Sequence, residues 1–198
     1  MLTQLSTVKS RLSILDSDTS QDAILTNALK AVSARFDHET NRTLARTENA
    51  THEFDPTDTE LSPPCYPIES VSKFETKSSE SEGWLDQPGI DYLIRRACII
   101  SLQPLALSPQ PSLARVTYTG GYLLPGSPPP DPPVAACQGL PDDLEQAAVE
   151  QVIYWFQTKE KLGLKVSWPT GVEYKQFSLL PLLPDVSQTL AHYRRWAL

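Results

Sequence analysis

The chain has 198 residues, 40% of them apolar, which is enough to bury one sizeable core or a core that carries an inserted lobe. Its 17 basic residues stand against 24 acidic ones, which leaves a formal net charge of -7. A chain of this charge is not expected to bind nucleic acid over a broad surface, because it would repel the phosphate backbone. Any contact with phosphate would have to be local.

The cysteines and the apolar runs bear on where the protein resides. Cys65, Cys98 and Cys137 form no CxxC pair, and none lies near a histidine at the spacing of metal ligands. Free thiols in a reducing compartment are therefore predicted. No charged stub followed by an apolar run opens the chain, and no stretch approaches the roughly 18 apolar residues that span a bilayer. These features predict a soluble protein that is not exported.

Two helices are predicted near the start of the chain. The first is short, and its apolar face has the members Leu5, Val8, Leu12 and Leu15. The second is expected to run from a capping residue, Ser20, to about Thr40, because its apolar residues follow the helical period. Its expected core stripe consists of Ile24, Leu25, Ala28, Leu29, Val32 and Phe36.

From Thr43 to Gly121 the helical period fades, and runs rich in β-branched and aromatic residues alternate with turn residues. A β-rich lobe is predicted there. Its expected strands are Ala50 to Phe54, Ile68 to Thr76, Tyr92 to Ile94 and Leu113 to Thr119, with Cys98 to Leu102 as a fifth candidate. The polar run 77–83 has nothing to bury, so an exposed hairpin loop is expected.

The second half of the chain is punctuated by prolines. Residues 125–133 hold six prolines in nine positions, which predicts a stiff, extended connector. A long helix should follow, with Pro141 at its first position, carboxylates in its first turn and Gly163 as its C-terminal stop. Residues 164–198 are apolar only in patches, and an extended arm is expected.

Few residues suggest catalysis or metal binding. Neither a GxxxxGK[ST] nor a GxGxxG motif occurs. The scattered His38, His52 and His192 are interpreted as plain surface histidines, because catalysis needs an oriented base beside a nucleophile. No catalytic residue and no cofactor is predicted.

An acidic loop holds Asp55, Asp58 and Glu60, which could bind a hard cation through oxygen ligands. The spacing lacks the glycine and the closing glutamate of an EF-hand loop. Solvated loop charge is the favoured interpretation, so no metal site is predicted.

The chain has two basic doublets, Arg95-Arg96 and Arg194-Arg195. The second lies between Tyr193 and Trp196, and such a tip could stack on nucleic acid or anchor in a groove of a partner protein. The partner is favoured, because exposed tryptophan and arginine are typical interface anchors and the net charge opposes DNA. Alternatively, Trp196 packs back on its own domain.

The order of three sequence stretches resembles the head-tail connector, or adaptor, family of tailed phages with their prophage and gene-transfer-agent relatives. The stretches are residues 7–14 with 22–25 and 31–43, residues 67–71, and residues 115–122 with 140–147. They match a short helix, an acidic turn and a helix ending near Asn-Arg-Thr, then the strand that starts a β insertion, then a strand, a Gly-Tyr turn and a proline-begun helix. The proline-rich insert and the tail after Gly163 depart from the family pattern.

The resemblance implies a helical bundle with a β lobe, assembled as a ring beneath the portal and matching its twelve-fold symmetry. The predicted fold class is α+β, mainly α: a bundle of two or three long helices with an inserted β-rich lobe and an extended C-terminal arm. The predicted segments are 1–43 for the N-terminal bundle helices, 44–122 for the lobe, 123–139 for the connector, 140–163 for the long C-terminal bundle helix and 164–198 for the arm.

The expected function is that of a structural virion protein, not an enzyme. It would extend the DNA channel, contact the portal, a tail completion or stopper protein and further copies of itself, and bind neither a specific DNA sequence nor a membrane. It would reside at the head-tail interface of the virion and in the host cytoplasm during assembly. The residues expected to bind the portal are Leu179, Leu180, Leu182, Leu183, Tyr193, Arg194, Arg195 and Trp196. The helices 20–40 and 141–162 are expected to meet neighbouring subunits.

Two alternatives belong to other classes. A tail or baseplate module could recognise a host glycan or protein through an exposed aromatic residue, Trp84, in the loop 82–85. A hydrolase could use the carboxylates between Asp55 and Glu60 or a thiolate at Cys98. The thiolate version is disfavoured, because an apolar run around Cys98 would raise its pKa.

Overall fold

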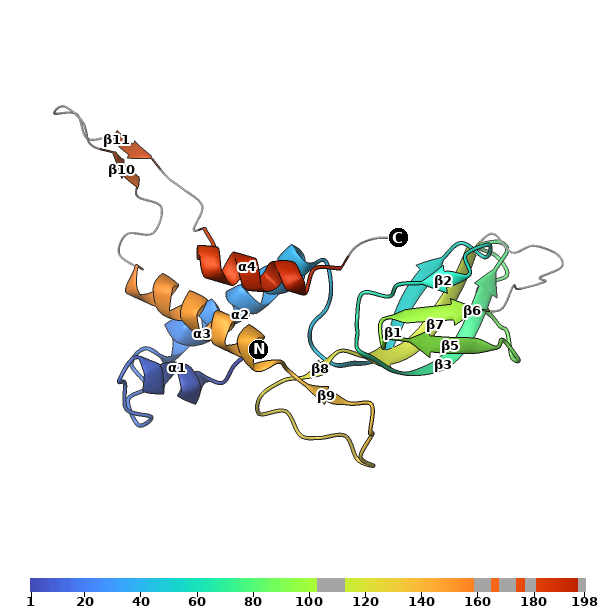
Figure 1. The fold of residues 1–198 in the computed structure, drawn as a ribbon, viewed down its shortest axis with the longest axis horizontal. Helices are drawn as coiled ribbons and strands as arrows, with labels where there is room; N and C mark the ends of the chain where they lie inside the picture. Colours follow the sequence, from blue (N-terminus) through green and yellow to red (C-terminus); the bar gives the residue numbers. More distant parts are fainter. Residues whose placement is uncertain (103–112, 159–164, 168–173, 177–180, 196–198) are drawn as a thin grey trace. The chain divides into compact units, whose positions relative to one another are not determined.

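A computed structural model describes residues 1–102, 113–158, 165–167, 174–176 and 181–195. The chain divides into two compact units. One, the helical unit, comprises Met1–Thr40 and Leu140–Arg194, and the other, the β unit, comprises Asn41–Gly139 and Arg195–Leu198. Figure 1 shows helices in the first and a cluster of strands in the second.

Four helices form the described core of the helical unit: α1 (Leu5–Arg11), α2 (Asp22–Thr40), α3 (Asp142–Gln157) and α4 (Pro184–His192). Helix α2 packs on α3, and α4 contacts both. Their buried apolar residues are Val8, Leu25, Leu29, Val32, Phe36, Leu144, Ala147, Ala148, Val149, Val152, Val186 and Leu190. The 3.6-residue period of the second predicted helix therefore produces a real core face.

Details of the predicted helices differ from the structure. Ile24 is 46% exposed and Leu15, beyond the end of α1, is 75% exposed, so neither belongs to the core. Helix α2 begins at Asp22, two residues after the expected cap at Ser20. Pro141 is the N-cap of α3 and not its first helical residue. The expected stop at Gly163 lies outside the described residues.

A buried lysine holds the turn between α1 and α2. Lys9 is only 3% exposed, and its ammonium donates to the carbonyl oxygens of Asp16 (2.9 Å) and Asp18 (2.7 Å). It also forms an ion pair with the carboxylate of Asp22 at 2.9 Å. An ammonium group has three N–H donors, so these oxygens can satisfy it in place of water.

The β unit contains two main antiparallel sheets. The first has the strand order β1-β7-β3-β4, with the bounds Thr47–Phe54, Leu113–Gly120, Ile68–Lys77 and Leu85–Asp86. The second has the order β2-β6-β5, with the bounds Glu60–Leu61, Ile99–Leu102 and Tyr92–Arg95. All five predicted strands are confirmed within a few residues, and the exposed loop between β3 and β4 is the predicted hairpin loop.

The β unit has a core of its own. Its buried members are Phe54, Leu61, Cys65, Ile68, Phe74, Ile100, Leu102, Ala114, Val116 and Tyr118. In β7 the residues Ala114, Val116 and Tyr118 are buried and alternate with Arg115 and Thr119, which are half-buried, while Thr117 on the second face is buried as well. The expected buried face of that strand is therefore confirmed.

The proline-rich residues lie in a loop whose two ends are close together. Strand β8 (Tyr122–Leu123) pairs in parallel with β9 (Gln138–Gly139), so the two ends of the intervening segment lie side by side. The loop belongs to the β unit. Helix α3 then begins three residues after β9.

The expectation of a mainly α fold with an extended arm is wrong. In the described residues the strands involve nearly as many residues as the helices, and the sheets build an independent core. After α3 the chain forms an antiparallel pair, β10 (Lys165–Ser167) with β11 (Tyr174–Gln176), and then α4. Val186 and Leu190 on α4 are at most 3% exposed, because this short helix is amphipathic and covers the larger ones.

Candidate functional site

The predicted portal-binding residues are partly engaged within the chain. Leu182 and Leu183 are half-buried, and the backbone N–H of Leu183 donates to the side-chain oxygen of Gln151 at 2.9 Å. Gln151 is fully buried on α3, so it fixes the start of α4. Leu179, Leu180 and Trp196 lie outside the described residues.

The basic tip that follows α4 is held at two of its three described positions. Within the helical unit, the hydroxyl of Tyr193 donates to the carboxylate of Asp143 at 2.7 Å, while Arg194 is exposed. Within the β unit, the Nε of Arg195 donates to the carbonyl oxygen of Ser62 at 2.9 Å. Arg194 is therefore the predicted contact residue whose side chain is most available to a partner.

Parts of two stretches that carry the family resemblance meet in the β unit, at Arg42 and Tyr122. Arg42, from the segment after α2, is 4% exposed and its guanidinium carbon lies 3.4 Å from the ring centre of Tyr66. The ring of Tyr122, after β7, lies 5.2 Å away on the same guanidinium. The guanidinium also donates to the carbonyl oxygen of Tyr66. Arg42, Tyr66 and Tyr122 are called the stacked cluster below.

The charge of the stacked cluster is stabilised by aromatic faces and a carbonyl. The attraction between a cation and aromatic rings is stronger where water is excluded. Burial raises the pKa of the Tyr66 hydroxyl, and the nearby Arg42 charge partly opposes that rise. The sequence order of the motifs pointed to this region, but nothing in the sequence pairs Arg42 with two tyrosines.

Two glycines let three backbone segments approach one another beside the stacked cluster. A Cβ on Gly120 would lie 2.4 Å from the carbonyl oxygen of Cys65, and one on Gly121 would lie 2.5 Å from that of Ala45. Gly121 also has a φ of +98°, which disfavours any other residue. The N–H of Gly121 donates to the carbonyl oxygen of Pro67 at 2.8 Å.

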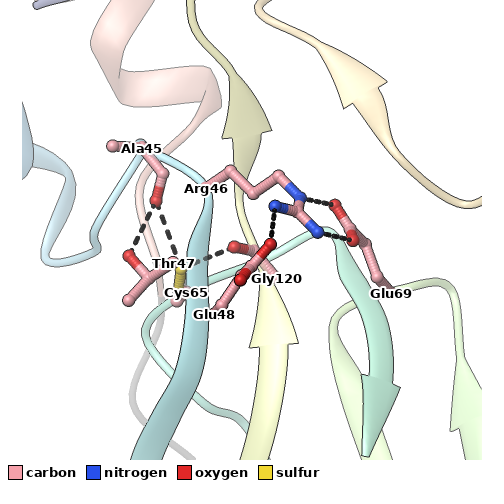
Figure 2. Close-up of polar contacts among 7 residues, drawn as sticks. All are labelled: Ala45, Arg46, Thr47, Glu48, Cys65, Glu69 and Gly120. Atoms are coloured by element: carbon pink, nitrogen blue, oxygen red, sulfur yellow. Dashed lines mark hydrogen bonds and ion pairs between the residues drawn. The ribbon is translucent and has the colours of Figure 1, made fainter. Parts of the chain in front are cut away.

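A polar network surrounds Gly120 (Figure 2). The thiol of Cys65 donates to the carbonyl oxygen of Gly120 at 3.0 Å. The backbone N–H of Cys65 donates to the hydroxyl oxygen of Tyr118 at 3.0 Å, and burial raises the pKa of Tyr118 to about 12. Cys65 is thus a buried structural thiol, and Cys98 and Cys137 are free thiols.

Arg46 ties the start of β1 to β3 in the same region (Figure 2). Its guanidinium donates to both carboxylate oxygens of Glu69, at 2.8 and 3.0 Å, and to Glu48 at 2.6 Å. The Glu69 side chain is 1% exposed and that of Arg46 is 15% exposed, so the forked pair is largely shielded from water. Burial and the adjacent Glu69 raise the pKa of Cys137 in the proline-rich loop.

Trp84, the proposed host-contact residue, is engaged by its own chain. The guanidinium carbon of Arg115 lies 4.2 Å from the indole ring centre, and the ammonium of Lys77 lies 5.6 Å from it. Arg115 also donates to Glu75 at 2.8 Å, and Lys73 pairs with the same carboxylate at 2.9 Å. The indole is half-buried, so it is not the freely exposed anchor that the sequence suggested.

The other candidate chemical groups serve local structure. Asp55 accepts from the N–H and hydroxyl of Thr57, and Asp58 accepts from the N–H of Asp55, which is the pattern of a capped turn. Burial, with Arg195 nearby, lowers the pKa of His52. Within the described part of the chain no group of three or more potential metal ligands occurs.

The described helices include none that is both long and apolar enough to cross a bilayer. Cys98, the thiol of the alternative hydrolase, is half-buried in the turn after β5.

The architecture is that of proteins found in the neck of phage-like particles. No family model and no curated protein matches the chain. The solved structures do include matches, and three of them come from gene transfer agent particles. A chain in the neck of the empty particle, computed with C6 symmetry, aligns with a TM-score of 0.57 and 13% identity. A chain in the neck of the native particle, computed with C12 symmetry, gives 0.55 and 14%, and one in the native virion gives 0.57 and 14%.

Each of these alignments covers 100% of the present chain and 91% of the other. The likeness therefore includes both units and the proline-rich loop and is not confined to one of them. At this level of identity it establishes a shared fold.

The two glycines give a test of the close backbone approach. Gly121→Ala should destabilise the β unit by roughly 3 kcal/mol, because it adds both an overlap with Ala45 and an unfavourable backbone conformation. Gly83→Ala is the matched control: Gly83 also has a positive φ, +71°, but no atom lies within 4 Å of the added Cβ. It should cost about 1 kcal/mol. Urea denaturation measures the free energy of unfolding of both variants. Equal losses of stability would contradict a steric overlap at Gly121.

The buried carboxylate beneath Trp84 predicts a pH dependence. Burial alone would raise the pKa of Glu75, but hydrogen bonds from Lys73 and Arg115 outweigh it and leave the pKa below the ordinary 4.5. The ionised Glu75 therefore contributes fully to the free energy of unfolding above pH 4.5. This contribution is lost as the pH falls through the lowered pKa of Glu75 in the folded protein. Glu75→Gln should lower the free energy of unfolding at neutral pH and flatten its decline in acid.

Glu82→Gln, in the exposed loop between β3 and β4, is the control for that measurement and should leave the curve unchanged. An identical acid decline in Glu75→Gln and the parent would contradict the assignment to Glu75.

Proposed function

We propose that this chain is a head-tail connector subunit, a structural virion protein that forms a ring under the portal. The observation that supports the proposal most directly is the fold likeness to chains of gene transfer agent necks, which extends over the entire chain. A neck joins a capsid to a tail, so a protein of this architecture has a place there without needing a catalytic site.

The symmetry of the similar assemblies supports a ring. Two of the necks were computed with C6 and C12 symmetry. A ring needs the same heterologous contact repeated until it closes. We infer about twelve subunits, with α2 and α3 as the elements of the helical unit that meet neighbouring subunits.

The charge of the chain fits a channel through which a genome passes. With a net charge of -7, few cations are available to neutralise phosphates and release their counterions. DNA would therefore slide past the ring without binding to it. We propose that the far side of the ring receives a tail completion or stopper protein.

We propose that the C-terminal residues attach the ring to the portal. Arg194 is exposed, and the aromatic Trp196 follows it closely in the sequence. Leu182, Leu183, Tyr193 and Arg195 have intramolecular roles or are half-buried, so they would contribute by holding the tip in place. The contact itself would begin at Arg194.

Co-sedimentation with assembled portal rings from the same genome tests the proposal. The purified chain should bind, and negative-stain microscopy should show a second ring stacked on the portal. A folded chain that leaves the portal bare would contradict the connector role and favour a host-recognition module of the tail or baseplate.

The portal contact has a sharper test. A chain ending at Tyr193 keeps α4, whose Val186 and Leu190 are buried, so it should remain folded but lose portal binding. Truncation at Ser178 would instead remove a core helix. Arg194→Glu should weaken binding about tenfold, as expected for an interfacial charge reversal. Arg96→Glu, an equal charge change at an exposed residue of the Arg95-Arg96 doublet, is the control. Unaltered binding by the shortened chain would rule out the C-terminal contact.

A further inference from the structure

An apolar edge strand of the β unit is exposed to solvent. Eight large apolar side chains are exposed among the described residues, and three of them are consecutive in β5: Tyr92 (37%), Leu93 (70%) and Ile94 (37%). Contiguous exposed apolar residues on a strand mark an interaction site, because proteins usually protect edge strands against pairing.

The edge of β5 is open. It is the terminal strand in the order β2-β6-β5, and within the described segments its ladder hydrogen bonds go to β6. A groove of about 290 Å³ lies beside it, between β3 and the segment 86–92. Tyr92 reaches across this groove, with its ring centre 5.7 Å from that of Phe74. The unpaired backbone groups and the groove together suit an added strand.

The side chains of β5 divide between two faces. Tyr92 and Ile94 stand opposite the buried Leu102 and Ile100 of β6, so they share the inner face. Leu93 stands opposite Ser101 and shares the outer face with Arg95, whose guanidinium pairs with Glu60 at 2.6 Å. Strand alternation puts the exposed Asp91 on the outer face as well.

This arrangement is self-complementary. If two β5 strands pair antiparallel about a two-fold axis at Leu93, then Leu93 faces its own copy and Tyr92 faces the partner's Ile94. Asp91 then faces the partner's Arg95, and all paired side chains lie on matching faces. In this register every apolar residue meets an apolar residue and every charge meets its opposite. Each Arg95 would hold its own Glu60 and the partner's Asp91.

We propose that two copies of the free chain pair through β5, antiparallel and centred on Leu93, to form one continuous six-stranded sheet. A contact of five residues per strand, 91–95, is small, so the dimer is weak. It covers the apolar edge before assembly.

The dimer and the ring exclude each other. In a cyclic ring every subunit points the same way along the axis, whereas a two-fold contact reverses one copy. The β5 pair therefore belongs to the free protein and has to open before a subunit joins a ring. The pairing itself goes beyond the connector role and does not depend on it.

A disulfide across the axis tests the register. Leu93→Cys is placed in a background of Cys98→Ala and Cys137→Ala, which removes the half-exposed native thiols. Directly opposed strand residues have Cα atoms about 4.5 to 5.5 Å apart, within the range that a disulfide spans. Leu93→Cys should form a covalent dimer under mild oxidation. Leu15→Cys in the same background is the control, because Leu15 is even more exposed, at 75%, and lies on the helical unit.

Sedimentation velocity tests the association without a cross-link. The parent chain should show a dimer that grows with concentration, and Leu93→Lys should abolish it by opposing two ammonium groups on the axis. Asp91→Arg should weaken dimerisation roughly tenfold, because two attractive pairs become repulsive. Leu15→Lys should leave it unchanged. Circular dichroism confirms that each variant is folded.

A parent chain that stays monomeric at its highest soluble concentration, with Leu93→Cys cross-linking no faster than Leu15→Cys, would overturn the proposal. This outcome is separate from failure of the connector role, which is measured by portal binding. If both the β5 pairing and the connector role are correct, the disulfide-linked dimer should not add to portal rings until it is reduced.

Discussion

At the end of β7 the backbone turns through two glycines, and segments from three distant parts of the sequence come into direct contact there. The carbonyl oxygens of Cys65 and Ala45 occupy the places that side chains would need. Because the backbones are so close, Cys65 bonds to Tyr118 and Gly120, and the main chain of residues 43–46 bonds to that of Pro64 and Tyr122. The stacked cluster and the Arg46–Glu69 pair depend on this approach, since both join residues from separate segments.

Two charged groups in this region illustrate different ways of burying an arginine. Arg46 meets a carboxylate that matches its planar fork, and both remain charged in a shielded position. Arg42 contacts two tyrosine rings and a carbonyl oxygen, which attract a cation without neutralising it. Both arginines lie near the start of the β unit's segment Asn41–Gly139, so they fasten its first residues to the sheet.

The sequence predicted individual elements better than their assembly. The stripe along α2 and the alternation along β7 are local patterns, and the structure confirms them. The predicted balance of helix and sheet is wrong, because the pairing of β1, β3 and β7 joins residues up to 73 positions apart and leaves no periodic signal. The expected arm was wrong for a related reason. A nine-residue helix such as α4 is too short to be stable alone, and only packing on α3 reveals it.

The candidate site could be predicted in outline only. The order of the motifs drew attention to the segments around Arg42, Pro67 and Gly121, and these segments do meet. The partners of Trp84 could not have been foreseen, because Arg115 and Lys77 approach it from strands whose register the sequence does not reveal. Tyr193 is similar, since its acceptor on Asp143 is 50 residues away.

The parallel pairing of β8 with β9 has a consequence for how this protein can vary. The ladder between β8 and β9 brings together the two ends of the segment 124–137. A change in the length of that segment therefore does not move the elements that precede and follow it. Doubling a closed loop of this kind costs only about 0.6 kcal/mol of chain entropy. The segment can therefore gain or lose residues, or accept an inserted tag, while β7 and α3 keep their places.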